Sequence, residues 1–224
     1  MDKKYIFISS IIACILLYFI EQVIGANYLI KTISKIVLFT MIPYIYIRFI
    51  KRVTIKEALN YKNIDKHHLK VGILLGIICF VVVIISYCVL GGAVDFDSIA
   101  IELQRKSKIS PVNFIFVGLY ITFGNSFLEE FFFRGFIFLN LYKLKYKKTA
   151  YIFSSLLFAL YHITIFKNWF ELWITFLAVV ALMIVGFIFD WIDTKSNNFV
   201  NSWIVHILAD SAIIFIGFKM FGIL

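Results

Sequence analysis

Long apolar runs recur along this chain, and they constrain its fold more than any other feature of the sequence. A helix needs about 20 mostly apolar residues to cross the hydrocarbon core of a bilayer. Seven runs approach or exceed this length, at residues 5–24, 28–50, 71–93, 111–142, 149–166, 169–191 and 198–221. Hydrophobic residues make up 62% of the chain and charged residues 16%, which excludes an ordinary water-soluble globular protein. We therefore expect an all-α, polytopic transmembrane bundle with about seven spans, within a range of six to eight.

The fourth run, at 111–142, is longer than one perpendicular crossing requires. Such a segment is either a strongly tilted helix that projects from the membrane or a helix broken near Gly124 and Asn125. We prefer the tilted helix, because an extra crossing would disturb the agreement between the number of spans and the placement of charge. A single membrane domain is expected to cover residues 1–224.

Basic residues gather in the connections between runs and indicate how the chain is oriented in a membrane. Lys3 and Lys4 precede the first run, which we interpret as an uncleaved first helix because no small-residue cleavage site follows it. The connections at 48–70 and 143–148 are rich in lysine and arginine and are expected in the cytoplasm, whereas the balanced 95–108 connection is expected outside. This topology explains the net charge of +9, so no nucleic-acid partner is expected.

The basic stretch at 52–69 contains Val53, Ile55, Ala58 and Leu59 among its charges. It is either a short amphipathic helix on the inner membrane surface or a basic connecting loop.

Some charged residues lie close to the ends of the predicted spans. Long side chains in such places reach the membrane interface, so we expect these groups to be structural. They are Glu21, Lys31, Lys35, Glu171 and Lys219.

Six ionisable residues lie deeper within three of the runs, where a charged side chain costs at least ~2.5–3.5 kcal/mol. Such residues are retained mainly where they are paired, face a cavity or perform chemistry. They are Glu129, Glu130 and Arg134 in the fourth run, His162 in the fifth, and His206 and Asp210 in the seventh.

The spacing of these residues separates a structural pair from a carboxylate with no partner on its own helix. Glu130 and Arg134 stand four residues apart, the favourable order for an ion pair on one helix face. Glu129 is turned by about 100° from Glu130, so its carboxylate has a different environment. We expect Glu129 to be free for chemistry.

A carboxylate in a low-dielectric cavity is suited to take a proton from water, which makes Glu129 a candidate general base. Imidazoles from His162 and His206 could hold that water, donate to a developing oxyanion or bind a divalent metal. The sequence contains neither a G-x-S-x-G nucleophile motif nor H-E-x-x-H. Hydrolysis of an amide or ester by water is the expected reaction, and a zinc site formed by His162, His206 and Glu129 or Asp210 stays open.

Three motifs resemble those of the CPBP intramembrane proteases, also called Abi, a family that includes CAAX prenyl endoproteases and bacteriocin-immunity proteins. Glu129-Glu130-Phe-Phe-Phe-Arg134 is similar to EExxxR, Phe158-Ala-Leu-Tyr-His162 to FxxxH, and His206-Ile-Leu-Ala-Asp210 to HxxxN/D. The motifs occur in the family's order, and the resemblance covers about 111–215, which we expect to be the catalytic core.

The resemblance implies a role for each motif residue. Glu129 would activate water, and His162 and His206 would bind that water or stabilise the oxyanion. Glu130 and Arg134 would brace the helix. Asp210 stands where relatives often have asparagine, and since an ionised carboxylate cannot donate a hydrogen bond, it would orient His206 or bind a metal instead.

The expected function is therefore that of an intramembrane endopeptidase acting on a membrane-associated peptide or protein. Composition suggests a low-GC Gram-positive bacterium, and the expected location is its plasma membrane. One alternative is a non-catalytic membrane protein that confers bacteriocin self-immunity or binds a peptide. A proton- or cation-coupled transporter is a further alternative, against which stands the absence of two similar halves in the sequence.

Overall fold

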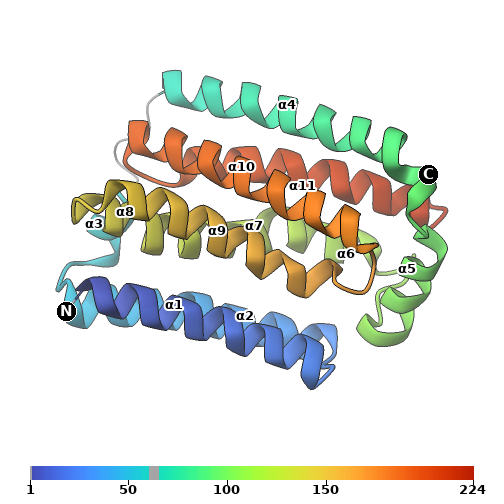
Figure 1. Cartoon of the computed structure of the whole chain (residues 1–224), viewed down its shortest axis with the longest axis horizontal. Helices are drawn as coiled ribbons and strands as arrows, with labels where there is room; N and C mark the ends of the chain where they lie inside the picture. Colours follow the sequence, from blue (N-terminus) through green and yellow to red (C-terminus); the bar gives the residue numbers. More distant parts are fainter. Residues whose placement is uncertain (1, 61–65) are drawn as a thin grey trace.

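The computed structural model describes residues 2–60 and 66–224, which form helices and turns with no β-strand among them. Long helices lie side by side and the chain ends lie at opposite ends of the bundle (Figure 1). The α-helices are α1 (Asp2–Tyr18), α2 (Tyr28–Ile45), α3 (Ile55–Leu59), α4 (Lys66–Leu90), α5 (Phe96–Glu102), α6 (Phe114–Leu119), α7 (Ser126–Glu130), α8 (Leu139–Lys143), α9 (Lys147–Phe166), α10 (Leu172–Ser196) and α11 (Val200–Met220).

Wider, π-helical turns extend or join several of these helices. Such turns insert one residue into the helical repeat and often occur at functional sites. They are η1 (Phe19–Val23), η2 (Tyr46–Ile50), η5 (Leu103–Ser107), η6 (Tyr120–Asn125) and η7 (Phe131–Phe138), while η4 (Gly91–Ala93) is a short 3-10 turn.

Six helices within the described residues are long and apolar enough to cross a membrane. They are Asp2–Val23, Tyr28–Ile50, His68–Ala93, Lys147–Phe166, Leu172–Ser196 and Val200–Met220. The polytopic helical bundle predicted from the sequence is confirmed. Our central number of seven spans exceeds by one the number that meets this criterion, and the difference is the run at 111–142, which contains Glu129, Glu130 and Arg134 among its apolar residues.

The 111–142 run forms an uninterrupted helix in which α6, η6, α7, η7 and α8 follow one another. The residues at the junctions, including Asn125 beside the expected break, keep right-handed helical backbone angles. This central helix, Phe114 to Lys143, is about 45 Å long at 1.5 Å per residue. The structure therefore has the continuous helix that we preferred and no break at Gly124.

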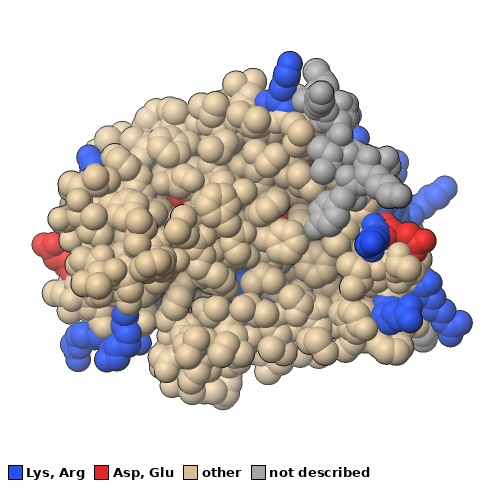
Figure 2. Space-filling view, turned by 180° about the vertical axis from the view of Figure 1, so that it is seen from behind, with Lys and Arg blue, Asp and Glu red and all other residues tan. Residues whose placement is uncertain are grey.

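Charged side chains gather at the two ends of the bundle, and a broad band of other residues lies between them on the face in Figure 2. This distribution matches the polarity of a bilayer, in which an apolar interior separates two polar surfaces. The basic connection at 143–148 joins α8 to α9 at one end, and α5 lies at the opposite end (Figure 1).

The short helix α3 begins at a capping box, a reciprocal pair of hydrogen bonds. The Thr54 side chain accepts from the backbone N–H of Glu57 at 3.3 Å, and the Glu57 carboxylate accepts from that of Thr54 at 2.8 Å. Of the two alternatives for 52–69, a short helix is present over Ile55–Leu59, while residues 66–69 belong to α4 and residues 61–65 lie outside the described part of the chain.

Aromatic packing fixes the central helix against α2 and α9. Phe39 of α2 stacks on Phe132 with ring centroids 4.0 Å apart, and it meets Phe133 edge-on at 5.6 Å. Phe133 in turn packs edge-on against Phe158 of α9 at 5.3 Å. All four rings are buried, so the turns that follow α7 are held from two sides.

Candidate active site

The central helix carries Glu129 and Glu130 on α7 and Arg134 in η7, and all three side chains are buried. The two adjacent glutamates face different neighbours, as their helical spacing predicted. Glu129 faces α2, α9 and α11, whereas Glu130 faces Arg134 and His206.

Glu129 has two carboxylate oxygens with different surroundings. Its Oε1 contacts the Nζ of Lys35 and accepts a hydrogen bond from Asn125 Nδ2 at 3.0 Å. Its Oε2 lies 3.5 Å from His162 Nε2 and 3.8 Å from His206 Nε2. Within the described residues Oε2 has no hydrogen-bond partner, although it is buried.

Each histidine is oriented through its other ring nitrogen. His162 Nδ1 lies 2.8 Å from the backbone carbonyl of Phe158, and because a carbonyl only accepts, Nδ1 donates and Nε2 faces Glu129. His206 Nδ1 lies 2.8 Å from Glu130 Oε1, which leaves its Nε2 facing Glu129 and Asp210. Hydrogen bonds of this kind fix ring orientation and tautomer.

Arg134 supports Glu130 from within the bundle. Its Nη1 lies 3.3 Å from Glu130 Oε1 and its Nε 3.6 Å from Asp190 Oδ1. The guanidinium also lies over the rings of Phe158 and Phe189, at 4.0 and 4.9 Å from their centroids. The ion pair predicted from the i, i+4 spacing is present, and it is part of a larger contact that includes α10.

Asp190 is held by two hydroxyl groups of α9. Ser154 Oγ and Ser155 Oγ donate to its two carboxylate oxygens at 3.1 and 3.0 Å. A chain of contacts thus runs from α9 through Asp190, Arg134 and Glu130 to the His206 ring. It fixes the imidazole that faces Glu129.

Asp210 lies one helical turn after His206, and its Oδ1 is 3.6 Å from His206 Nε2. The carboxylate is buried, and its Oδ2 lacks a hydrogen-bond partner among the residues that the structure describes. All four side chains predicted to perform chemistry, Glu129, His162, His206 and Asp210, therefore meet in one place, brought there by three different helices.

Lys35 was expected to extend to the membrane interface, and this expectation is wrong. Its side chain is buried in the bundle, where Nζ contacts Glu129. Glu129 is consequently not the unpaired carboxylate that we expected. Helical spacing reports neighbours on one helix, whereas Lys35 and Glu129 are 94 residues apart.

The polar cluster is formed by Glu129, Glu130, Arg134, His162, His206 and Asp210. It also includes Asn125 and Asp190, which no sequence motif indicated. Asn125 stands four residues before Glu129, a spacing that could have indicated the contact. Asp190 lies in the sixth apolar run, at 169–191, where a buried acid was a signal of the same kind as Glu129.

The residues proposed as metal ligands are not arranged as a metal site. Among the described residues there is no group of three or more His, Cys, Asp or Glu side chains placed to hold an ion. A lysine ammonium already contacts Glu129, the central candidate ligand. The zinc site predicted from the sequence is therefore untested, and the mechanism below is derived from the side chains alone.

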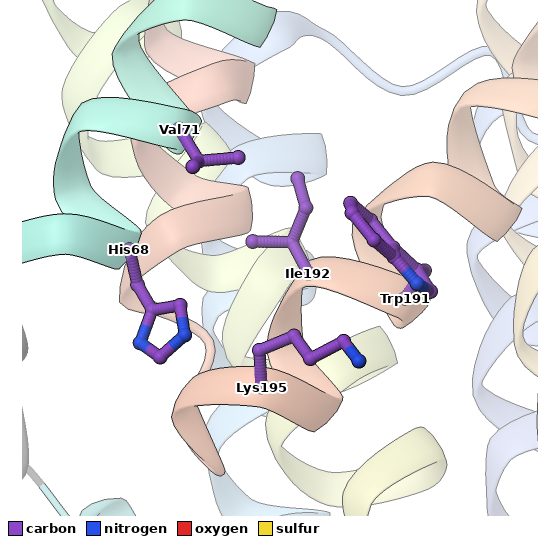
Figure 3. Close-up of a pocket in the computed structure, with 5 residues that line it drawn as sticks. All are labelled: His68, Val71, Trp191, Ile192 and Lys195. Atoms are coloured by element: carbon purple, nitrogen blue, oxygen red, sulfur yellow. The ribbon is translucent and has the colours of Figure 1, made fainter.

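A separate pocket of about 240 Å³ lies between α4 and α10. Its lining residues come from the first turns of α4 and the last turns of α10 (Figure 3). They are His68, Val71, Trp191, Ile192 and Lys195, none of which belongs to the polar cluster around Glu129.

Comparisons with known proteins agree with the motifs. A UPF0177 protein, YxdF of Lactococcus lactis subsp. lactis (strain IL1403), is 38% identical over 78 residues, a match that spans 35% of this chain and 37% of that protein. No solved structure matches the chain significantly. Residues 111–212 match the model of a protease family and include all three motifs. The CAAX protease family that the motifs predicted is thereby confirmed for this part of the chain, which matches the Rce1-like type II CAAX prenyl endopeptidases.

Proposed function

We propose that the protein is an intramembrane endopeptidase in which Glu129 activates a water molecule to hydrolyse a peptide bond. One observation carries this proposal. The buried Oε2 of Glu129, without a hydrogen-bond partner among the described residues, faces Nε2 atoms of two histidines from two other helices. A carboxylate and two oriented imidazoles that converge on one point are the groups that hydrolysis by water requires.

The distances between these groups leave Glu129 Oε2 without a direct hydrogen bond to either imidazole, and they suit a water that lies beside the three atoms rather than between them. The separations of 3.5 and 3.8 Å between Glu129 Oε2 and the two Nε2 atoms exceed the usual 2.7–3.2 Å of a direct hydrogen bond. A water molecule beside them would donate one proton to Oε2 and be oriented by the imidazoles. Oε2 would then hold the proton that the attacking water must lose.

The reaction proceeds in two steps. Glu129 takes a proton from water while the water oxygen forms a bond to the carbonyl carbon, and the carbonyl oxygen becomes an oxyanion. A His206 imidazole protonated on both nitrogens donates from Nε2 to that oxyanion, while His162, whose Nδ1 donates to the Phe158 carbonyl, accepts a hydrogen bond from the water through Nε2. The Glu129 carboxyl group then gives its proton to the leaving nitrogen as the C–N bond breaks, which regenerates the carboxylate.

Asp210 supports His206 in this scheme. Its Oδ1 lies 3.6 Å from the Nε2 that faces Glu129, so an ionised Asp210 favours the protonated imidazole that can donate to the oxyanion. This role replaces the direct donation that an asparagine amide could provide at the same position.

The substrate we propose is a membrane-associated peptide or protein, such as a bacteriocin, a pheromone precursor or a leader sequence. Glu129 is only 1% exposed and lies between helices, among them α2, α9 and α11, that are long and apolar enough to cross a bilayer. A peptide anchored in the membrane could approach such a site laterally, which a freely soluble chain could not. The proposed location is the plasma membrane of a bacterium.

Comparative peptidomics of membranes and culture medium tests the proposal. Cells would express the wild type, Glu129→Gln or His206→Ala at matched levels, with Glu171→Gln as the control because Glu171 is exposed and lies outside the site. We expect new peptide termini with the wild type and the control, and their loss with both site variants. If all four strains yield identical peptides, and both site variants keep the cellular phenotype that the wild type confers, the result would instead support a non-catalytic immunity or peptide-binding role.

Zinc content can be measured independently of cleavage. The contact between Lys35 and Glu129 disfavours a second cation beside the same carboxylate. We expect elemental analysis of the purified wild type to give less than one zinc per chain, with no difference from His162→Ala. A full equivalent of zinc that His162→Ala removes would instead assign the metal to this site.

A further inference from the structure

Lys35 is a buried lysine of α2, outside the 111–212 segment that matches the protease family. Its Nζ contacts Glu129 Oε1 and lies within hydrogen-bond distance of Asn125 Oδ1. The ammonium also lies over the ring of Tyr161, 5.0 Å from the centroid, and near Phe39 at 5.6 Å. Every one of these contacts holds the charge close to Glu129.

The formal charges around Glu129 show why a cation matters here. Among the described residues, the buried acids are Glu129, Glu130, Asp190, Asp193 and Asp210. The buried lysine and arginine side chains of the described residues are Lys35 and Arg134. Arg134 faces Glu130 and Asp190. Lys35 is therefore the basic side chain among them that directly contacts Glu129.

Stability alone does not account for a lysine at this position. A buried ion pair is often no more stabilising than well-packed apolar residues of similar volume, because both charges lose their hydration. Lys35 is 7% exposed and has the aromatic rings of Phe39 and Tyr161 beside its polar contacts. Apolar side chains in place of both Lys35 and Glu129 would fill the same space without that cost, so the presence of the pair points to a role for its charges.

We propose that Lys35 is a positioning residue for the reaction of Glu129, an inference that rests on the proposed function. By holding Oε1, together with Asn125, it fixes the rotation of the carboxylate so that Oε2 faces His162 and His206. The charge of Lys35 also offsets that of the carboxylate in a low-dielectric site. Helix α2 thus completes a site whose motifs all lie in the matched segment.

The test uses a peptide that the wild-type protein is found to cleave in the peptidomics experiment. Its steady-state cleavage would be measured with purified protein in liposomes. Lys35→Met keeps the length of the side chain and removes the ammonium. Because a misplaced catalytic group can cost about 100-fold, we expect kcat to fall by about 100-fold while KM changes little. Lys35→Arg keeps a positive charge at this position and should recover part of kcat.

Lys31→Met is the matched control. Lys31 stands one turn earlier on α2 and forms its own ion pair with Glu21 at 2.8 Å, away from Glu129. The same substitution on the same helix should leave kcat within about twofold of the wild type, since surface-accessible ion pairs contribute little. If Lys35→Met retains the wild-type kcat, the positioning role is refuted. A higher kcat would refute it too, because it would show that the contact with Glu129 inhibits the reaction.

A thermodynamic cycle provides a readout that does not depend on activity. The free energy of unfolding would be measured for the wild type, Lys35→Met, Glu129→Gln and the double variant. If the two groups interact, the loss caused by Lys35→Met should be much smaller in the Glu129→Gln background. Additive losses would contradict the contact.

The two tests separate this inference from the proposed function. If the wild type cleaves no peptide although the cycle shows coupling, the contact is structural, and both the proposed function and the positioning role are rejected. If the wild type cleaves and Lys35→Met cleaves equally well, the proposed function stands and the positioning role alone is rejected.

Discussion

Arg134 is fully buried, and its guanidinium contacts the rings of Phe158 and Phe189. Its replacement by methionine would leave the carboxylates of Glu130 and Asp190 without their cation. Removal of one partner from a buried pair typically costs about 3–5 kcal/mol, and we expect a loss of that size in the free energy of unfolding. Chemical unfolding in mixed lipid–detergent micelles would measure it.

Arg105→Met is the control for this prediction, because Arg105 is exposed and lies outside the bundle core. Exposed substitutions usually change stability by less than about 0.5 kcal/mol. If Arg134→Met were as stable as Arg105→Met, the contacts of Arg134 with Glu130 and Asp190 would not contribute to folding.

Residue-level prediction succeeded where the signal lay within one helix. The spacing of Glu130 and Arg134 predicted their ion pair, and the helical twist predicted a different environment for Glu129. Lys35 was misplaced because its position near the end of an apolar run is compatible with an interface location. Its burial depends on a contact between helices, which no single-helix pattern contains.

Helices α9 and α10 approach closely at Gly186. A Cβ atom at this position would lie 2.9 Å from Ser155 Cβ and 3.0 Å from its backbone Cα, so a larger residue would push the two helices apart. We expect Gly186→Ala to destabilise the protein by about 1–3 kcal/mol, the usual cost of overpacking. Thermal unfolding in detergent would detect this as a lower Tm.

Gly92→Ala serves as the comparison, because a Cβ atom there would meet nothing within 4 Å. Alanine usually favours helical structure over glycine, so without a clash the change is neutral or favourable. An increase in Tm for Gly186→Ala would show that α9 and α10 are not in close contact at this point.

The capping box of α3 should respond to acid. Hydrogen bonds from Thr54 hold the pKa of the Glu57 carboxyl below its ordinary value of 4.5. The contribution of the cap to stability is therefore complete above the unfolded pKa and is lost as pH falls through the lower folded pKa. We expect Thr54→Ala to move the Glu57 pKa back towards 4.5, as measured by NMR titration of labelled glutamate.

Asp95 is an internal reference for this titration. Hydrogen bonds from Ser98 hold the pKa of Asp95 below its ordinary value in the same way, at the opposite end of the bundle. Thr54→Ala should leave the Asp95 titration unchanged. An unchanged Glu57 pKa in the variant would mean that the cap does not persist in solution.

At the scale of the whole molecule, the arrangement of charge predicts orientation. The end that carries the basic 143–148 connection should face the cytoplasm, and the end that carries α5 should face outside. In a variant with its three cysteines replaced by alanine, a membrane-impermeant maleimide should label Arg105→Cys in intact cells. Lys148→Cys should react only after permeabilisation, and the reverse pattern would contradict this topology.

Hydropathy predicted the helical bundle because the apolar bilayer core requires a long apolar segment for each helix that crosses it. All seven apolar runs became helices, and six of them correspond to the helices that are long and apolar enough to cross a membrane. The seventh, 111–142, is the run that contains Glu129, Glu130 and Arg134. How the helices pack was not predictable, because the outward faces of most of them are equally apolar. The meeting of α2 with α7, which brings Lys35 to Glu129, could be found only from the structure.

That meeting also determines when the protein can complete its assembly. Lys35 leaves the ribosome 94 residues before Glu129, an interval of roughly 5–20 s at usual rates of synthesis. During this time α2 carries an ammonium group without its carboxylate partner, and the side chain has to extend towards lipid headgroups or water. The final depth and rotation of α2 are therefore set only after α7 has been synthesised, so a helix made before α7 reaches its native position only after it.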